Sequence, residues 1–326
     1  MNIGITGIGH AAPNKTLTNA DLEKVVETSD EWIVSRTGIH ERRIAEPGQV
    51  TSDWAYAAAK QAIAQAGIKA EDIDLIVIGT TTPDMPLPSC ACIVQEKLGA
   101  TNAAAFDVAA ACSGFVYALT TAHKFLLSKS HKTALVIGVD QISSFIDWSD
   151  RATCILFGDA GGACILQEVD GRGIMQTAIG SDGRYKDLIT IPAGGTKASA
   201  SQATVDSGGH YLKMNGKEVF KHAVRGMVHS ITELLEQSNL TAKDIKCLVP
   251  HQANLRIIDA VSSRLDMEKE KIYLNLDRYG NTSAASVIVA LSEAHQKQMF
   301  KKGDLILLST FGAGLVWGSA LLEWSY

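Results

Sequence analysis

The segment Ala70-Glu-Asp-Ile-Asp-Leu-Ile-Val77 is the best guide to the fold, because the chain repeats its pattern as Ala242-Lys-Asp-Ile-Lys-Cys-Leu-Val249. In both copies a short polar segment leads into an apolar run that is too short for a helix, which predicts a buried strand. The two copies lie 172 residues apart, and Thr133-Ala-Leu-Val-Ile-Gly138 and Leu305-Ile-Leu-Leu-Ser-Thr310 lie the same distance apart. One spacing held over separate elements indicates a duplicated chain.

A duplication of this length predicts an α/β protein made of two domains of similar topology, because such a period is far too long for a stack of small repeats. We expect the first half to cover residues 1–170 and the second to cover residues 171–326. Gly162–Leu166 matches Gly318–Leu322 at a smaller offset of 156 residues. The first half is therefore expected to carry about sixteen extra residues between Gln141 and Phe157.

Local patterns predict the elements of the first half. The glycines of Gly7-Ile-Gly9-His-Ala-Ala12 resemble a dinucleotide-binding loop, but Pro13 follows where such a loop needs a helix, so we assign these glycines to a tight turn. We expect helices at about Asn19–Glu27, at about Glu31–Arg36 and from a cap at Thr51 or Ser52 through Ala66, and strands at Ile3–Ile8, Asp72–Ile78, Ala103–Ala110 and Thr133–Gly138.

The composition excludes several classes of protein. Apolar residues make up 46% of the 326 residues, which is typical of a globular chain, and the net charge of −5 argues against general nucleic-acid binding. The N-terminus lacks the pattern of a signal peptide and no apolar run is long enough for a bilayer, so we expect a cytoplasmic protein with no membrane contact. The six cysteines are expected as reduced thiols. Cys90-x-Cys92 lacks zinc-site spacing, so no metal is expected.

A candidate nucleophile lies in Asp107-Val-Ala-Ala-Ala-Cys112-Ser-Gly-Phe115, where small residues lead to a cysteine and a helical pattern follows. A thiol before a helix meets the positive end of the helix dipole, which favours the thiolate. The alternative is that Cys112 is one more small buried apolar residue. The second half of the chain favours the nucleophile over the buried apolar residue.

Two polar spots of the second half are expected at strand exits that correspond to the position of Cys112. His251-Gln-Ala-Asn254 follows a predicted strand, and Gly280-Asn281-Thr-Ser283 occupies the place that matches the Cys112 segment. Sites in α/β sheets form at the carboxyl ends of strands, where loops converge. A cysteine, a histidine and an asparagine are therefore expected to meet between the halves.

The sequence resembles the type III ketoacyl-acyl-carrier-protein synthases of the thiolase-like superfamily. The resemblance covers essentially the whole chain, and its most specific pieces are Ala111–Phe115, His251–Asn254, Gly280–Ser286 and Asp30–Ile39. It implies a thiolase-like duplicated five-layered α/β/α/β/α arrangement. It also implies a homodimer, acyl-CoA and malonyl-acyl carrier protein as substrates, acyl carrier protein as a partner, and no tightly bound cofactor.

The resemblance implies a role for each residue of the Cys-His-Asn set. Cys112 would attack the acyl-CoA thioester and hold the acyl group, and His251 and Asn281 would bind the malonyl thioester oxygen as the enolate forms. The backbone N–H groups of Cys112 and Ala313 would form the oxyanion hole. Ala313 stands where the family has a glycine, in Phe311-Gly-Ala-Gly314.

The resemblance also assigns the binding residues. The CoA and pantetheine arm would contact Thr28, Trp32, Arg36, Arg151, Gly216, Phe220 and Asn254. Leu87, Leu156 and Phe157 would bound the acyl pocket, with Leu87 reaching the pocket of a partner subunit. Lys221 and Arg256 would form a basic patch that meets the acidic carrier protein.

Other functions are compatible with these residues. A related Cys-His-Asn condensing enzyme of secondary metabolism, or one for long-chain head-to-head condensation, would use the same set. A non-catalytic acyl-CoA binder would gain nothing from a reactive thiol, and a thioesterase would turn over without malonyl-carrier protein.

Overall fold

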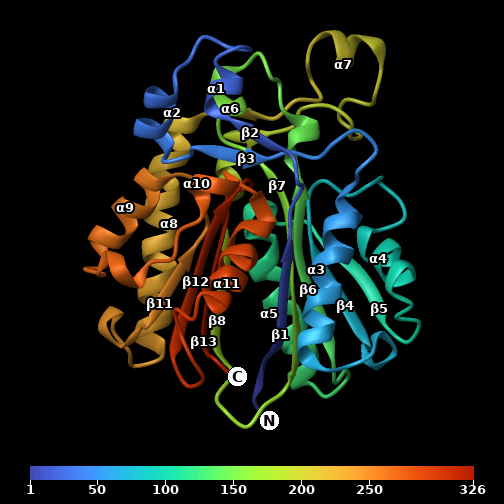
Figure 1. Ribbon diagram of the computed structural model, residues 1–326, viewed down its shortest axis with the longest axis vertical. Helices are drawn as coiled ribbons and strands as arrows, with labels where there is room; N and C mark the ends of the chain where they lie inside the picture. Colours follow the sequence, from blue (N-terminus) through green and yellow to red (C-terminus); the bar gives the residue numbers. More distant parts are fainter.

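Two β-sheets, one from each half of the chain, form the frame of the protein (Figure 1). The computed structural model describes all 326 residues. The first sheet has the order β1-β7-β6-β4-β5, with β1 (Ile3–Ala11), β4 (Leu75–Gly79), β5 (Ala104–Val108), β6 (Ala134–Gln141) and β7 (Asp159–Glu168). The second has the order β8-β13-β12-β11, with β8 (Ile174–Ser181), β11 (Cys247–Pro250), β12 (Leu305–Gly312) and β13 (Val316–Glu323).

The strand pairing confirms the duplication. In the first sheet β1 pairs antiparallel with β7, β7 antiparallel with β6, and β6 parallel with β4. In the second sheet β8, β13, β12 and β11 pair in the same order and with the same directions. The second half has no counterpart of β5; a single bridge between Leu248 and Ile272 stands there instead. The domain boundary at residue 170 stays a prediction.

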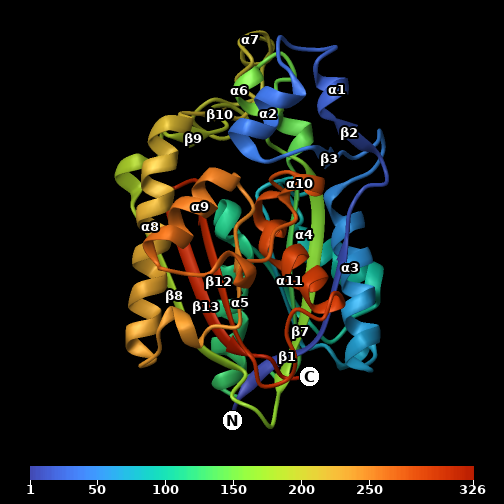
Figure 2. The same cartoon turned by 60° about the vertical axis from the view of Figure 1, so that its left-hand side comes forward.

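Helices fill three layers around the two sheets and complete the predicted five-layered arrangement (Figures 1 and 2). The apolar helices α5 (Gly114–Leu127) and α11 (Ser286–Gln296) lie between the sheets, where Phe115, Leu119 and Leu291 are fully buried. The outer faces are covered by α3 (Thr51–Ala66) and α4 (Cys90–Leu98) on the first sheet and by α8 (Gly216–Gln237) and α9 (Leu255–Arg264) on the second. None of the helices is long and apolar enough to cross a membrane.

The tight turn that we predicted at Gly7 and Gly9 is wrong, because β1 continues through both residues, with only a shift in its register to β7 between Ile5 and Gly7. Both glycines face α3 instead. A Cβ atom at Gly9 would lie 2.6 Å from the carbonyl oxygen of Ala58, and one at Gly7 would collide with that of Ala62. Glycine is needed here because the alanine-rich helix approaches the backbone of the strand.

Helix boundaries differ from the sequence prediction in two places. Neither Thr51 nor Ser52 caps α3: Val50 is the cap residue and the Asp53 carboxylate accepts its N–H at 3.0 Å. The Ser52 hydroxyl instead donates to Asp84 in a neighbouring loop at 2.6 Å. The helix predicted at Asn19–Glu27 covers only α1 (Asn19–Leu22), because the chain turns after Leu22.

Short elements from both halves gather above the carboxyl ends of the parallel strands, at the top of Figure 1. They are β2 (Thr16–Thr18), α1, α2 (Asp30–Thr37), β3 (Glu41–Arg43), α6 (Arg151–Cys154), β9 (Ile189–Thr190), α7 (Gln202–Asp206), β10 (Lys213–Met214) and α10 (Leu276–Tyr279). α6 lies in the extra segment predicted for the first half, whereas residues 313–315 alone join β12 to β13. The insertion is therefore confirmed, and it lies over the site.

Candidate active site

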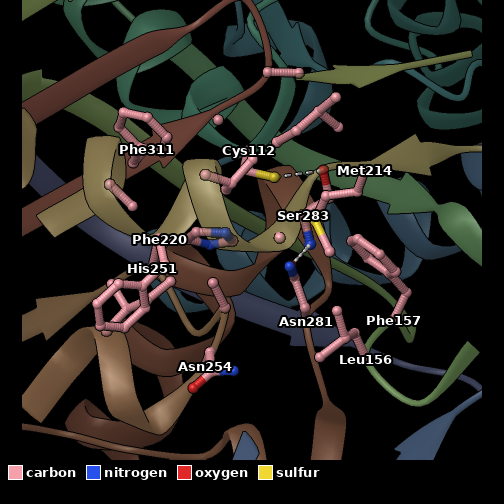
Figure 3. Close-up of a pocket in the computed structure, with 18 of the residues that line it drawn as sticks. Cys112, Leu156, Phe157, Met214, Phe220, His251, Asn254, Asn281, Ser283 and Phe311 are labelled. Carbon is pink, nitrogen blue, oxygen red and sulfur yellow. Dashed lines mark hydrogen bonds between the residues drawn. The ribbon is translucent and has the colours of Figure 1, made fainter. Parts of the chain in front are cut away.

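A cavity of about 930 Å³ opens under these short elements. Cys112, His251 and Asn281 all line it, so the structure brings the predicted set together (Figure 3). Most of the other lining side chains are apolar, among them Phe157 and Phe311. A mostly apolar cavity with a few convergent polar groups is the usual form of a small-molecule site.

Cys112 stands in a 3₁₀ turn, Ala111–Ser113, which we call the cysteine turn; it links β5 to α5. The thiol is half-buried on the cavity wall. Burial raises the pKa of Cys112 to about 12, and the nearby Asp140 carboxylate adds to this while the Ser283 hydroxyl acts against it. Desolvation thus acts against the helix dipole, whose effect on the thiolate stays a prediction.

His251 directly follows β11, and its N–H donates to the carbonyl oxygen of Ser309 at 2.7 Å. The imidazole is buried, and its Nδ1 lies 2.6 Å from the Ser286 hydroxyl oxygen, at the start of α11. Burial lowers the pKa of His251 to about 4. The ring is therefore neutral at neutral pH, with one nitrogen committed to Ser286 and the other available.

Asn281 follows α10 through Gly280, whose φ of 64° is one that residues other than glycine seldom adopt. Its backbone N–H donates to the carbonyl oxygen of Leu156 at 2.8 Å, which ties it to the wall of the cavity. Its side-chain Oδ1 accepts the N–H of Ser283 at 2.9 Å. The carbonyl end of the amide is therefore occupied, and the NH₂ end is the group left to act as a donor.

A carboxylate that the sequence analysis missed holds the segment before Asn281. Glu293 of α11 accepts two hydrogen bonds from the Arg278 guanidinium, both at 2.9 Å, and one from Asn275 at 2.9 Å. The hydroxyls of Tyr273 and Tyr279 donate to it at 3.2 and 3.1 Å. These donors lower the pKa of Glu293 to about 2 against the opposing effect of burial.

A second missed carboxylate, Asp140, lies at the end of β6 and is fully buried. Its Oδ1 accepts the backbone N–H groups of Thr81 and Thr82 at 2.8 and 3.2 Å. Its Oδ2 accepts the N–H of Ala284 at 3.1 Å. Asp140 thus joins the strand exit of the first half to the 3₁₀ turn Ser283–Ala285, which we call the serine turn.

The mouth of the cavity contains most of the residues predicted for the CoA arm. Trp32, Arg36, Gly216, Phe220 and Asn254 line the cavity. Thr28 and Arg151 do not, although the Arg151 guanidinium carbon lies 4.7 Å from the centre of the Trp32 ring.

The residues predicted for the acyl pocket fall in two places. Leu156 and Phe157 line the cavity, whereas Leu87 is 84% exposed in the loop before α4 and does not line it. The predicted carrier-protein residues lie on the rim. Lys221 forms an ion pair with Glu218 at 2.7 Å, and Arg256 lies over the ring of Phe220.

The loop after β12 approaches the nucleophile closely. Gly312 and Ala313 line the cavity, and a Cβ atom at Gly312 would lie 2.7 Å from the backbone nitrogen of Cys112. Glycine is thus required at 312, whereas position 313 accommodates the alanine side chain. No three His, Cys, Asp or Glu side chains are grouped so that they could hold a metal ion.

Comparisons with known proteins agree over the whole chain. The family described as 3-Oxoacyl-[acyl-carrier-protein (ACP)] synthase III matches residues 106–183, and the family described as its C terminal matches residues 235–324. A Beta-ketoacyl-[acyl-carrier-protein] synthase III of Caldanaerobacter subterraneus subsp. tengcongensis is 52% identical over 99% of this chain and 98% of the relative.

Solved structures give the same result. The 3-oxoacyl-[acyl-carrier-protein] synthase III of Aquifex aeolicus superposes with a TM-score of 0.92 at 42% identity, over 99% of this chain and 100% of that one. The corresponding synthase of Pseudomonas aeruginosa gives a TM-score of 0.93 at 38% identity, over 100% of this chain and 99% of that one.

Proposed function

Because this chain belongs to the β-ketoacyl-[acyl-carrier-protein] synthase III family, whose members are condensing acyltransferases that initiate fatty acid synthesis, we propose that it acts through an acyl-Cys112 intermediate. An acyl-CoA is the first substrate and malonyl-acyl carrier protein is the second. The product is a 3-ketoacyl-acyl carrier protein. The thiol, imidazole and amide in the cavity suffice for this chemistry, so the reaction needs no bound cofactor.

In the first stage Cys112 becomes acylated. Its sulfur attacks the thioester carbonyl carbon, the bond between that carbon and the CoA sulfur breaks, and CoA leaves with the proton that the thiol gives up. The backbone N–H groups of Cys112 and Ala313 stabilise the tetrahedral oxyanion. The close approach of the 312–313 loop to the backbone of Cys112 supports this pairing.

In the second stage the malonyl group loses carbon dioxide. Negative charge develops on its thioester oxygen, and the His251 imidazole and the Asn281 amide donate hydrogen bonds to that oxygen. Their existing partners support this assignment. When the Ser286 hydroxyl donates to Nδ1, the proton of His251 stands on Nε2, and the engaged Oδ1 of Asn281 leaves its NH₂ group for substrate. The resulting carbanion attacks the acyl carbonyl, and Cys112 leaves.

The substrates reach Cys112 through the mouth of the cavity. Trp32 and Arg151 hold the adenine of CoA, with Arg36 and Thr28 nearby; the stacked indole and guanidinium form a surface suited to a base. Gly216, Phe220 and Asn254 line the pantetheine path, and Leu156 and Phe157 bound the acyl group. Lys221 and Arg256 on the rim attract the acidic carrier protein.

Further features of the proposal concern the assembly. The protein is a cytoplasmic homodimer, and the exposed Leu87 enters the acyl pocket of the partner subunit. The two halves, residues 1–170 and 171–326, are its two domains. The exposure of Leu87, in a loop that does not line the cavity of its own chain, supports its role in the partner subunit.

The meeting of Cys112, His251 and Asn281 in one cavity carries the proposal. The test is the intact-protein mass after mixing with acyl-CoAs from acetyl to long chain. We expect a single acyl increment that is lost in Cys112→Ala and kept in Cys92→Ala, which removes an exposed thiol as a control. Acylation that persists in Cys112→Ala would remove Cys112 from the mechanism. Turnover without malonyl-carrier protein would instead indicate a thioesterase.

A further inference from the structure

The serine turn brings one more polar group to the nucleophile. The Oγ of Ser283 lies 3.5 Å from the Sγ of Cys112, with its hydroxyl as the donor, and Ser283 is buried at 2% exposure (Figure 3). We propose that Ser283 is a further catalytic residue, whose hydroxyl stabilises the Cys112 thiolate by a hydrogen bond. This inference rests on the proposed role of Cys112 as the nucleophile.

The backbone of the serine turn does not require this hydroxyl. The duplication relates Ser283 to Ala111, 172 residues earlier, and each residue opens a 3₁₀ turn with a positive φ, 51° at Ser283 and 43° at Ala111. Alanine therefore supports the same turn without a hydroxyl. At this pair of equivalent positions, the half that lacks the nucleophile supplies the oxygen that contacts it.

The hydroxyl is also held in place from both sides. The N–H of Ser283 donates to Oδ1 of Asn281 at 2.9 Å, and the N–H of the next residue, Ala284, donates to Oδ2 of Asp140 at 3.1 Å. The serine turn also packs against the start of α5, since a Cβ atom at Gly114 would lie 3.1 Å from the Cβ of Ala284. A donor that is fixed before the reaction loses no freedom when the charge appears.

The surroundings of the thiol leave this hydroxyl few competitors. Burial and the Asp140 carboxylate both raise the pKa of Cys112, whereas the Ser283 hydroxyl is the side chain that lowers it. The His251 ring is neutral, because burial lowers its pKa to about 4, and it brings no positive charge to the sulfur. In such a site a neutral donor to the developing anion has a large effect.

The hydroxyl acts twice in the proposed reaction and keeps its own proton. When Cys112 attacks, its sulfur forms the bond to the acyl carbon, CoA departs, and the proton of the thiol ends on the CoA sulfur. When the carbanion attacks the acyl group, the carbon–sulfur bond of Cys112 breaks and its electron pair returns to the sulfur. Ser283 stabilises the sulfur anion in both steps.

The test compares how fast iodoacetamide alkylates Cys112 in the wild type and in Ser283→Ala, between pH 6 and pH 9. Because the reagent reacts with the thiolate, its rate reports the thiolate population at each pH. Alanine keeps the Cβ atom and adds no steric demand at the positive φ. We expect about a tenfold lower rate at every pH, with mass spectrometry assigning the adduct to Cys112, and a similar loss in the acylation rate with acyl-CoA.

Two further variants distinguish the effect of the hydroxyl from an effect on the fold. Ser283→Gly also lacks the hydroxyl but relieves the positive φ, so we expect the same loss as with alanine; wild-type rates in it would show that backbone strain is responsible and would overturn the proposal. Ser230→Ala removes another buried hydroxyl, one that donates to Ser319 at 2.8 Å, and should leave alkylation unchanged.

The outcomes also separate this inference from the proposed function. Unchanged alkylation and acylation in Ser283→Ala would overturn the role of Ser283 while leaving Cys112 as the nucleophile. Equal labelling of Cys112→Ala and the wild type would overturn the role of Cys112 itself, and with it the role of Ser283.

Discussion

Replacing Glu293 with glutamine should weaken both the fold and the second stage of the reaction. The carboxylate accepts from Arg278 through both oxygens and also binds Asn275, Tyr273 and Tyr279. Glutamine has the same shape but only one acceptor atom. Its NH₂ group would face the guanidinium of Arg278, where donor would meet donor. The segment that leads to Asn281 would lose its anchor on α11.

The size of the effect follows from the ionisation of Glu293. Lowering its pKa from 4.5 to about 2 corresponds to about 3 kcal/mol of unfolding free energy at neutral pH. A carboxylate whose pKa is depressed in the folded state contributes fully above its unfolded pKa, and the contribution is lost as the pH falls towards the folded value. The difference between wild type and Glu293→Gln should therefore be about 3 kcal/mol at pH 7 and less than half of that by about pH 3.

Urea unfolding at a fixed protein concentration, repeated from pH 7 to pH 3, measures this difference. Glu236→Gln is the matched control, since Glu236 is exposed on α8 and should shift stability by less than about 0.5 kcal/mol. Acylation of Cys112 should persist in Glu293→Gln while condensation with malonyl-carrier protein falls about tenfold. A difference in stability that stays constant from pH 7 to pH 3 would contradict this role of Glu293, because it could not come from the ionised carboxylate.

Further predictions concern the site and the fold. Asn281→Ala should still acylate but lose condensation by about a hundredfold or more, as measured by single-turnover mass spectrometry; full condensation would remove the enolate role. Trp32→Ala should raise the KM for acyl-CoA without lowering the kcat, and the opposite pattern in steady-state kinetics would contradict the adenine assignment. Lys221→Glu should raise the KM for malonyl-carrier protein most strongly at low salt, and an effect independent of salt would argue against a charge contact. Gly7→Ala should lower the unfolding free energy by about 2 kcal/mol or more in urea, because its Cβ would meet the carbonyl of Ala62; wild-type stability would show that α3 can move away.

The duplicated fold could be predicted because the apolar segments that form the strands recur at one spacing in the sequence. Apolar runs at one offset gave the matching strands, and the observed pairing order agrees with them. The role of Gly7 and Gly9 could not be predicted. A glycine indicates that something requires its small size or its freedom, but the sequence does not say whether a turn or a neighbouring helix is the cause.

The Cys-His-Asn set could be predicted as a cluster because Cys112 and His251 follow strands, and strand exits meet at one edge of a sheet. The strand exit predicted at Asn281 is wrong, since Asn281 follows α10, but the duplication still placed it opposite Cys112. The ionisation of Cys112 could not be predicted, since burial is a property of the folded surroundings. Glu293 could have been noticed in the sequence, because it is the single acidic residue in the apolar run that forms α11, where it is buried. Ser283 could also have been noticed, because the duplication matches it to Ala111, the residue next to Cys112.

The backbone contacts beneath Cys112 have a consequence for how substrates enter. A side chain at Gly114 would press on Ala284, one at Gly138 would meet the same residue, and one at Gly312 would meet the nitrogen of Cys112. At Gly138 and Gly312 the backbones of the two halves approach each other directly, because glycine places no side chain between them. Such close packing resists movement, so we expect the floor of the site to stay fixed. If the two halves separated here, Cys112 would move away from His251 and Asn281. Entry of the acyl chain and release of the product are then expected to depend on movement of the short elements above the cavity.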